Sequence, residues 1–315
     1  FAIDRSVGCR HNNEMSHDEV HNLKKMIVHL EDQLQLKSSE VLTYRQELIK
    51  MSHKLDELMS QVAFDVEVLS RLQKIIVPTE VPQLPGFEIS RKFVYGTKSG
   101  GDYFDFFENK DKLQFGILIA ASSGYAMSAL FLSLILKISH MVESKKGKTP
   151  DLILQGLAEE IKSLASSAPR SQQATASSSV DMTHAFYGLI DRRKYSMSFC
   201  MAGQVHGFYL TSNRNLQILK STSAPLSQNF SEKLTLAELD LEPKSRLCLI
   251  TYGLYDVLGE DQVAQIILDT SKQDVHSLRN ELLFQAQKKS GLDMPTRDQT
   301  VVVIDVKDRV IKLAK

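Results

Sequence analysis

The stretch "HAFYGLIDRRKYSMSFCMAGQVHGFYL", residues 184–210, decides the fold class. It contains runs rich in aromatic and aliphatic residues at about 184–191, 194–202 and 205–211, each of strand length. Only a few residues separate one run from the next, so short turns must join them. The stretch therefore predicts neighbouring strands that pair in an antiparallel sheet.

Further strands and helices follow on both sides of this stretch. Strand-like runs lie at about 87–95, 113–121, 215–220, 233–240, 246–252 and 300–306. Helical periodicity lies at about 125–143, 150–166, 260–269 and 273–289. Because strands follow one another while helices stand apart in pairs, we expect an α+β domain of layered sheets and helices rather than a doubly wound one. We assign this domain to residues 87–308, with a flexible Ser/Ala/Gln-rich loop at about 163–180 and a C-terminal tail at 309–315.

A seven-residue apolar repeat runs through the first quarter of the chain. Its first positions are Val20, Ile27, Leu34, Val41, Leu48, Leu55, Val62, Leu69 and Ile76. Of the positions three residues later, six are apolar and two, Lys37 and Asp65, are charged. No Pro or Gly interrupts residues 17–77. A strict heptad predicts a left-handed coiled coil. No other segment has a matching repeat, so we expect a parallel homodimer; the alternative is a helix that packs on its own globular domain.

The segments that flank this helix differ from it in composition. Residues 1–16 precede the repeat, and we expect them to be disordered. The stretch "VPTEVPQLPG", residues 77–86, contains three prolines, which end the helix. We therefore assign residues 78–86 to a linker between the coiled coil and the domain.

Composition limits the classes of function. Lys+Arg and Asp+Glu both number 38, so the formal net charge is zero, which does not favour nucleic-acid binding. The three cysteines, Cys9, Cys200 and Cys248, lie far apart without metal-ligand spacing, which is typical of a reducing compartment such as the cytoplasm. The longest apolar run contains Ser and Gly and predicts core rather than a membrane span. Because the sequence begins with Phe1, we expect a fragment whose upstream domain is missing.

Several blocks of the sequence resemble one family in the same order along the chain. The blocks are "LQKIIVPTEVPQLPGFEISRKF" (72–93), "GGDYFDFF" (100–107), "LIAASSGYAMSAL" (118–130), "FYGLIDRRKYSMSFCMAGQVHGFYL" (186–210), "LEPKSRLCLITYGLYDV" (241–257) and "TRDQTVVVIDV" (296–306). Together they resemble a SpoIIE/RsbU-type domain, the bacterial branch of the PPM metal-dependent serine/threonine phosphatases. The resemblance covers roughly residues 72–306.

This resemblance implies both a fold and a chemistry. The family fold is an α-β-β-α sandwich, in which two antiparallel sheets pack face to face with helices outside. Aspartates at one end of the sandwich hold two Mg²⁺ or Mn²⁺ ions, which are hard cations that prefer oxygen ligands. The ions activate a water molecule that attacks the phosphorus of phosphoserine or phosphothreonine.

The aspartates that bind metal in the family are mostly replaced here. Asp102 matches the aspartate of the "GGD" block and is the residual family ligand. The other family ligand positions hold Ala121, Tyr252 and Arg297. Asp105 and Asp298 are further possible metal ligands. The cleft implied by the resemblance also includes Gly101, Ser123, Gly124, Tyr125 and Gly253. We assign no catalytic residue.

The resemblance and its departures together predict a pseudophosphatase. One carboxylate gives weak affinity for a divalent ion, so we expect no cofactor. We also expect the Arg297 guanidinium to pair with Asp102 or Asp105 and so to substitute for the missing charge of the metal. The resemblance implies a protein partner such as a STAS-type anti-sigma-factor antagonist, and we expect no nucleic acid and no membrane in this fragment.

Two alternatives remain open. In the first, the chain is an active phosphatase with a remodelled site that holds two Mg²⁺ or Mn²⁺ ions, and nearby acids such as Asp256 or Glu260 compensate for the missing ligands. In the second, the coiled coil is the functional element and the globular domain is an inert terminal module.

Overall fold

The computed structural model describes residues 17–76, 84–97, 101–108, 113–122, 147–167 and 182–307. The chain divides into two compact units, with the boundary between Phe64 and Asp65. Within the described segments, no helix combines the length and the apolar character that a membrane crossing requires.

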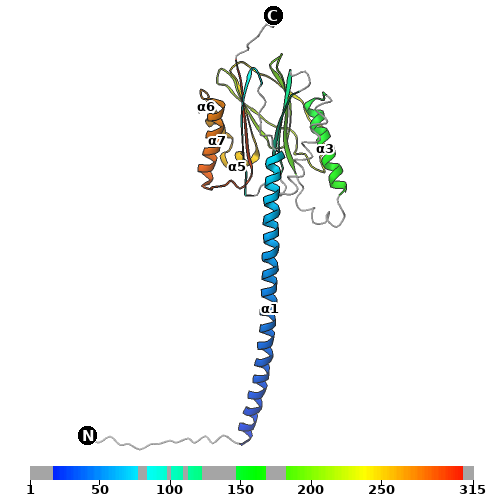
Figure 1. Cartoon of the computed structure of the whole chain (residues 1–315), viewed down its shortest axis with the longest axis vertical. Coiled ribbons are helices and arrows are strands. Elements are labelled where there is room, and N and C mark those ends of the chain that lie inside the picture. The colour runs from blue at the N-terminus through cyan, green and yellow to red at the C-terminus, as the bar shows by residue number, and fades with distance from the viewer. Residues whose placement is uncertain are drawn as a thin grey trace, which may run out of the picture. The chain divides into compact units, whose positions relative to one another are not determined.

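The heptad segment forms one long helix, α1 (His17–Ile76), as the repeat predicts (Figure 1). Repeat positions between Leu23 and Leu58, where the structure describes the side chains, are exposed to solvent in the single chain: Leu34 is 71% exposed, Leu48 66% and Met51 70%. Lys37, which interrupts the apolar stripe, pairs with Glu40 one turn further along at 2.7 Å. A helix with such an apolar stripe needs a second surface to bury it. The homodimer stays a prediction.

The rest of the chain contains two five-stranded antiparallel sheets. The first has the order β1-β10-β9-β6-β7 and the second the order β2-β3-β4-β5-β8. The strands of the first sheet are β1 (Phe87–Val94), β6 (His206–Leu210), β7 (Leu216–Leu219), β9 (Arg246–Ile250) and β10 (Gln299–Val306). Those of the second are β2 (Asp102–Glu108), β3 (Gln114–Ser122), β4 (Thr183–Asp191), β5 (Ser196–Ala202) and β8 (Ala237–Asp240). Every neighbouring pair is antiparallel, as the short turns predict.

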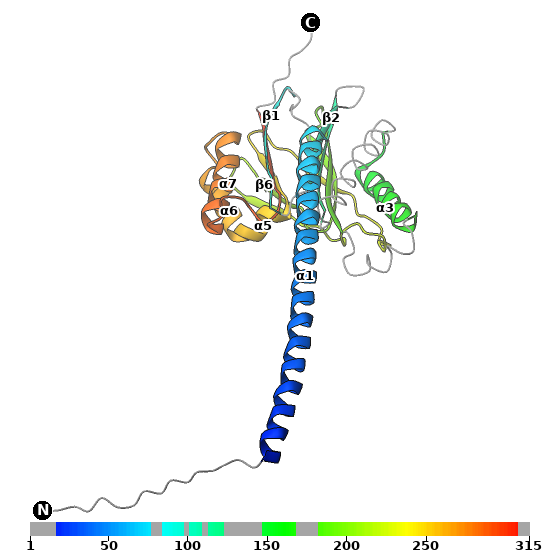
Figure 2. The same cartoon turned by 60° about the horizontal axis from the view of Figure 1, so that its bottom comes forward.

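The two sheets pack face to face, and helices cover their outer faces (Figures 1 and 2). Among the described residues of this part, the helices are α3 (Pro150–Ser167), α5 (Tyr252–Leu258), α6 (Glu260–Asp269) and α7 (Val275–Ser290). Alternate strand residues such as Phe104, Ile119 and Val302 form the core between the sheets. Two further apolar clusters lie under α3 on one side and under α5, α6 and α7 on the other. The predicted α+β sandwich is confirmed.

Some local predictions differ from the structure. β2 and α5 were not expected, because acidic residues interrupt the apolar pattern of β2 and α5 is only seven residues long. The strand expected at 246–252 ends at Ile250, and Tyr252 begins α5. The helix expected at 150–166 is α3, which continues to Ser167 and so overlaps the first residues of the loop expected at about 163–180. The helix expected at 125–143 lies outside the described residues, as do residues 1–16, residues 78–83 of the linker, residues 168–180 of the loop and the tail.

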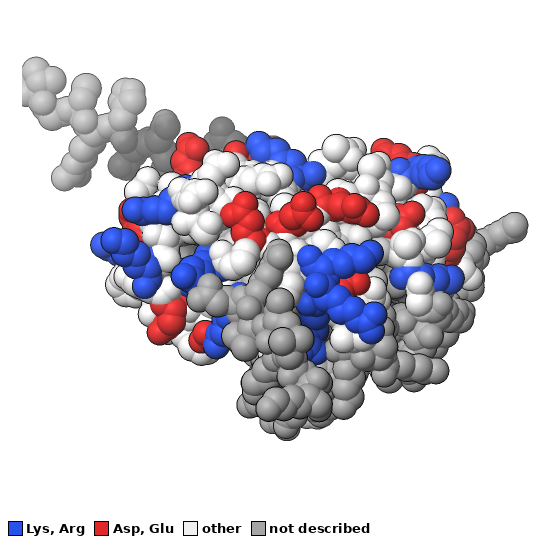
Figure 3. Space-filling model, turned by 90° about the horizontal axis from the view of Figure 1, so that it is seen from above, with Lys and Arg blue, Asp and Glu red and all other residues white. Residues whose placement is uncertain are grey.

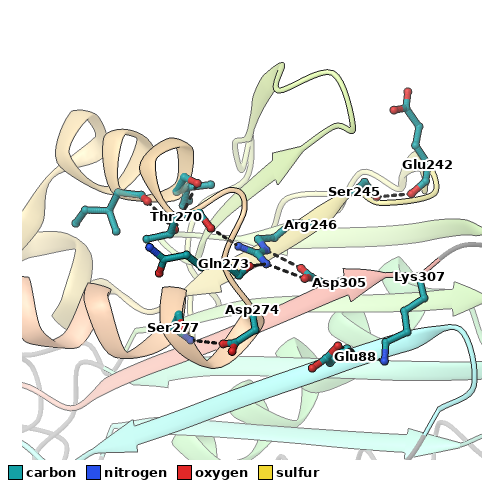
Figure 4. A network of polar contacts seen from close by, with 12 residues as sticks. Glu88, Glu242, Ser245, Arg246, Thr270, Gln273, Asp274, Ser277, Asp305 and Lys307 are labelled. Carbon is teal, nitrogen blue, oxygen red and sulfur yellow. Dashed lines mark hydrogen bonds and ion pairs between the residues drawn. The ribbon is translucent and has the colours of Figure 1, made fainter.

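A buried arginine joins the first sheet to its helices (Figure 4). Arg246 on β9 donates two hydrogen bonds to the carboxylate of Asp305 on β10, at 2.6 and 2.7 Å. It also donates to the carbonyl oxygens of Thr270, at 3.1 Å, and Gln273, at 2.6 Å, in the α6–α7 connection. The side chain of Arg246 is 6% exposed. Nearby, Lys307 and Glu88 form a solvent-exposed ion pair at 3.2 Å.

Charges of both signs are mixed on the surface. On the face seen in Figure 3, basic and acidic side chains lie side by side. This mixture agrees with the equal numbers of acidic and basic residues in the chain.

Candidate functional site

Three neighbouring strands of the second sheet place their residues in one row at an end of the sandwich. Asp102 on β2 pairs directly with Ala121 on β3, and Ala121 pairs with His184 on β4. Side chains two residues further along these strands, such as Phe104 and Phe186, belong to the core between the sheets. Because strand residues alternate between faces, the row Asp102–Ala121–His184 also faces the first sheet.

Asp102 connects the two sheets. Its Oδ2 atom accepts hydrogen bonds from the hydroxyl of Thr251, at 2.6 Å, and from that of Thr300, at 2.8 Å. Thr300 lies on β10 and Thr251 directly follows β9, so both donors come from the first sheet. Burial raises the pKa of Asp102 well above its usual range, the nearby Asp298 charge raises it further, and the two hydroxyl bonds oppose this rise.

The carboxylate of Asp298 accepts hydrogen bonds from backbone amides near both ends of the β1–β2 connection. Its Oδ1 accepts from the N–H of Gly96 at 2.8 Å, and its Oδ2 from those of Gly101 at 3.1 Å and Asp102 at 3.4 Å. The backbones here lie very close: a Cβ added to Gly101 would be 2.5 Å from the carbonyl oxygen of Ser122. Asp298 is buried, and its two oxygens organise the entry to β2.

Tyr252 and Gly253 form the first turn of α5. Thr251 precedes them as N-cap with an extended backbone, which turns the chain sharply from β9 into the helix. Tyr252 donates its hydroxyl hydrogen to Asp256 at 3.1 Å, one helical turn further along. A Cβ added to Gly253 would be 2.0 Å from the carbonyl oxygen of Asp298. This close approach explains why a glycine follows Tyr252.

The expected pairing of Arg297 with Asp102 or Asp105 is wrong. The Arg297 side chain is exposed, and its Cζ atom lies 5.4 Å from the centroid of the Tyr252 ring. The nearest acidic side chains of the buried site already accept other hydrogen bonds, Asp102 from hydroxyls and Asp298 from amides. An exposed cation–π contact keeps the guanidinium hydrated, whereas burial beside Asp102 would cost its solvation.

Asp105 lies on the opposite face of β2 from Asp102. Its Oδ2 accepts from the hydroxyl of Tyr103 at 2.8 Å and its Oδ1 from the N–H of Phe106 at 2.8 Å. Tyr103 belongs to the cluster under α3, so the structure does not bring Asp105 into the row with Asp102. Ser123, Gly124 and Tyr125, which the sequence placed in the cleft, lie outside the described residues.

His184 also lies at this site, although no sequence motif singled it out. Its Nδ1 accepts a hydrogen bond from the backbone N–H of Gln204 at 2.9 Å, and its ring stacks on Tyr252 with centroids 6.4 Å apart. Burial lowers the pKa of His184, and the Arg297 charge lowers it further. Because side chains alternate between the two faces of a strand, the position of His184 near the start of β4 could have indicated that it faces the other sheet.

His206 is a second histidine that the sequence analysis missed. Its ring stacks on Tyr255 with centroids 3.4 Å apart and an interplanar angle of 3°. Burial lowers the pKa of His206 to about 4. Tyr255 in turn donates to Glu260 at 3.4 Å. Two histidine rings therefore stack on tyrosines of α5, in the pairs His184–Tyr252 and His206–Tyr255.

The described residues offer few oxygen ligands for a metal ion at this end. Asp102 and Asp298 are the carboxylates that the site brings together, and both oxygens of Asp298 accept amide hydrogens. Among the described residues, no group of three or more His, Cys, Asp or Glu side chains could hold a metal ion.

Comparisons with known proteins agree with this fold. Residues 111–307 match the family model of stage II sporulation protein E (SpoIIE). The chain is 24% identical over 158 residues to the phosphoserine phosphatase RsbU of Bacillus subtilis (strain 168), which covers 50% of this chain and 43% of that protein. The chain thus spans less than half the length of this relative.

Solved structures show the same architecture. The SiaA-PP2C domain of Pseudomonas aeruginosa superposes with a TM-score of 0.64 at 17% identity, over 79% of this chain and 98% of that one. The RsbU and RsbW domains of Rv1364c from Mycobacterium tuberculosis give a TM-score of 0.59 at 16% identity, over 74% and 63%. At such low identity the structures establish the fold alone. The family model covers more than half of the chain, and the chain therefore belongs to the SpoIIE family of PPM-type phosphatase domains.

Proposed function

We propose that this chain is a regulatory pseudophosphatase, which keeps the PPM fold and binds a protein regulator without hydrolysing phosphate esters. The observation that supports this most directly is the pair Asp102–Ala121. A methyl group faces the buried carboxylate from the neighbouring strand, at a position where the family has a second aspartate.

The donor set does not fit two divalent cations. Mg²⁺ and Mn²⁺ need several anionic oxygens at short range. Asp102 offers a carboxylate whose ionised form is disfavoured by burial, and Asp298 already accepts amide hydrogens with both oxygens. At the remaining positions, Tyr252 donates its hydroxyl elsewhere and Arg297 is a permanent cation. We derive no catalytic step through metal ions for this site.

The proposed regulatory role includes two kinds of partner. The exposed apolar stripe of α1 supports a parallel homodimer. The likeness to RsbU supports a protein regulator such as a STAS-type anti-sigma-factor antagonist as the bound partner. Cys200 and Cys248 are buried free thiols, which supports action in the cytoplasm.

Metal titration and turnover test the loss of catalysis. Mn²⁺ and Mg²⁺ are titrated into the full chain by calorimetry, and hydrolysis of p-nitrophenyl phosphate and of a phosphoserine peptide is followed with Mn²⁺ and with EDTA. We expect no micromolar site and no turnover above that of a D102A control. Mn²⁺-dependent turnover that disappears in D102A would restore the active-phosphatase alternative and reject our proposal.

A direct binding assay tests the regulator. The full chain is immobilised, and a purified STAS-domain protein is passed over it in its phosphorylated and unphosphorylated forms. We expect saturable binding of one form at micromolar concentration. The absence of binding by either form would reject this class of partner.

A further inference from the structure

An arginine and a histidine both contact one aromatic ring, that of Tyr252, at the candidate site. The Arg297 Cζ atom lies 5.4 Å from the Tyr252 ring centroid, and the His184 ring stacks on the same tyrosine at 6.4 Å with an interplanar angle of 25°. Arg297 and His184 are also close enough for the arginine charge to act on the imidazole. They therefore form one local cluster, although they come from opposite sheets.

A backbone hydrogen bond fixes which nitrogen of His184 can act as a donor. The N–H of Gln204 donates to Nδ1 at 2.9 Å, so a neutral imidazole carries its proton on Nε2. The backbone of Gly203 holds the ring in place, since a Cβ there would be 2.3 Å from Nδ1. His184 thus presents an N–H donor that does not depend on protonation of the ring.

The carboxylates around the cluster are already engaged. Asp298 accepts three backbone amides, Asp256 accepts the Tyr252 hydroxyl, and Glu260 pairs with Lys220 at 3.2 Å. Asp102 accepts two threonine hydroxyls from the first sheet. Within the described residues, the exposed Arg297 guanidinium forms no ion pair. Its N–H donors are therefore available to an anion from solution.

We propose that Arg297 and His184 form a metal-free binding site for a phosphate monoester, which the chain binds and does not cleave. A guanidinium can bind two phosphate oxygens with parallel hydrogen bonds, and the Nε2–H of His184 supplies a further donor. The Tyr252 ring contacts the guanidinium through a cation–π interaction. This inference rests on the proposed loss of catalysis and names the ligand of the same site. The phosphate comes either from a phosphoserine side chain of a protein or from a free anion.

Binding in the absence of metal tests the site. The full chain is titrated in EDTA with inorganic phosphate and with a phosphoserine peptide, by calorimetry, beside the matching serine peptide. We expect phosphate-dependent binding that R297Q weakens by about tenfold or more, as for the loss of a charge-assisted hydrogen bond. R297K, which keeps the charge but loses the planar fork, should give an intermediate affinity. The control R193Q removes the same charge from the exposed β4–β5 turn and should change affinity by less than about twofold.

The possible outcomes distinguish a failure of the phosphate site from a failure of the proposed function. Tighter binding of the phosphopeptide assigns a phosphoprotein ligand, and equal or tighter binding of inorganic phosphate assigns a free anion. If neither probe binds in EDTA, or if R193Q weakens binding as much as R297Q, the site does not exist. Metal-dependent turnover would instead reject the pseudophosphatase while leaving metal-free binding at Arg297 as a separate result. Thermal unfolding of each variant confirms that it is folded.

Discussion

Asp102 and Ala121 occupy directly paired positions on β2 and β3, with both side chains turned toward the opposite sheet. A buried carboxylate thus has a methyl group as its cross-strand neighbour. Its hydrogen-bond partners are threonine hydroxyls from the other sheet. In this arrangement Asp102 connects the two sheets.

A second carboxylate in the position paired with Asp102 should make the stability of the folded protein depend on Mn²⁺. In A121D, two acidic side chains would lie in one buried cross-strand pair, and we expect a loss of about 2 kcal/mol or more in EDTA. Mn²⁺ should recover part of this loss by neutralising both groups. Thermal unfolding with and without Mn²⁺ measures the effect, and A121N serves as the uncharged control. Equal stabilisation of A121D and the unmodified chain by Mn²⁺ would contradict this prediction.

The stability of the protein should depend on the ionisation of Asp102. Because its pKa is raised in the folded state, its contribution to stability is complete below about pH 4, the ordinary carboxyl value. That contribution is lost as the pH rises toward the raised pKa. D102N carries a neutral amide at every pH and still offers an oxygen to the two threonines. We therefore expect D102N to gain stability relative to the unmodified chain between pH 5 and pH 8. Urea unfolding at both pH values checks this, with the exposed Asp293→Asn change as control; a parallel pH dependence of all three proteins would count against it.

The Arg246–Asp305 pair should be important for stability, whereas the Lys307–Glu88 pair should not. D305A leaves the buried Arg246 guanidinium without its carboxylate, and we expect a loss of about 3 kcal/mol in the free energy of unfolding. K307A removes a pair with 56% and 40% exposed side chains, and should cost less than about 1 kcal/mol. Urea unfolding compares the two variants directly. Similar losses in both would show that burial does not set the strength of these pairs.

The apolar stripe of α1 should hold two chains together. Replacing Leu48 and Leu55 by glutamate puts charges in the seam, and we expect the double variant to be a monomer. The matched control places glutamates at Gln46 and His53, which lie on the opposite side of the repeat, and should stay dimeric. Light scattering after size-exclusion chromatography gives the mass of each. A monomeric unmodified chain, or a dimeric L48E/L55E variant, would refute the coiled-coil dimer.

Two glycines should respond oppositely to the same substitution. In G253A the new Cβ would lie 2.0 Å from the Asp298 carbonyl oxygen, so the backbone must move, and we expect a loss of about 2 kcal/mol or more. In G156A, within α3, no atom lies within 4 Å of the new Cβ, and the higher helix propensity should add roughly 0.5–1 kcal/mol. Thermal unfolding checks the sign of each change. Tolerance of G253A would mean that the α5 turn is looser than this contact indicates.

Local patterns in the sequence predicted much of the fold. The short turn between the runs at 184–191 and 194–202 produces the antiparallel pair β4–β5, whereas the run at 205–211 forms β6 in the other sheet. The uninterrupted heptad produces a long helix. Both are determined by residues that are neighbours along the chain. β2 was missed because acidic residues interrupt its apolar pattern, and α5 because seven residues carry too little helical periodicity. The candidate site was only partly predictable for a different reason, since its residues come from strands far apart in sequence.

The sequence by itself determined the order of the motifs, and through them the resemblance assigns residues of this chain to the family's ligand positions; that assignment stays a prediction. It also determined that Ala121, Tyr252 and Arg297 cannot supply carboxylates. The tertiary structure alone decided that Arg297 lies on Tyr252 rather than beside Asp102, and that His184 belongs to the same cluster. The physical reason is competition for partners: the threonine hydroxyls and backbone amides that satisfy the buried aspartates reach them only when the two sheets pack, so no local pattern can show which donor each aspartate accepts.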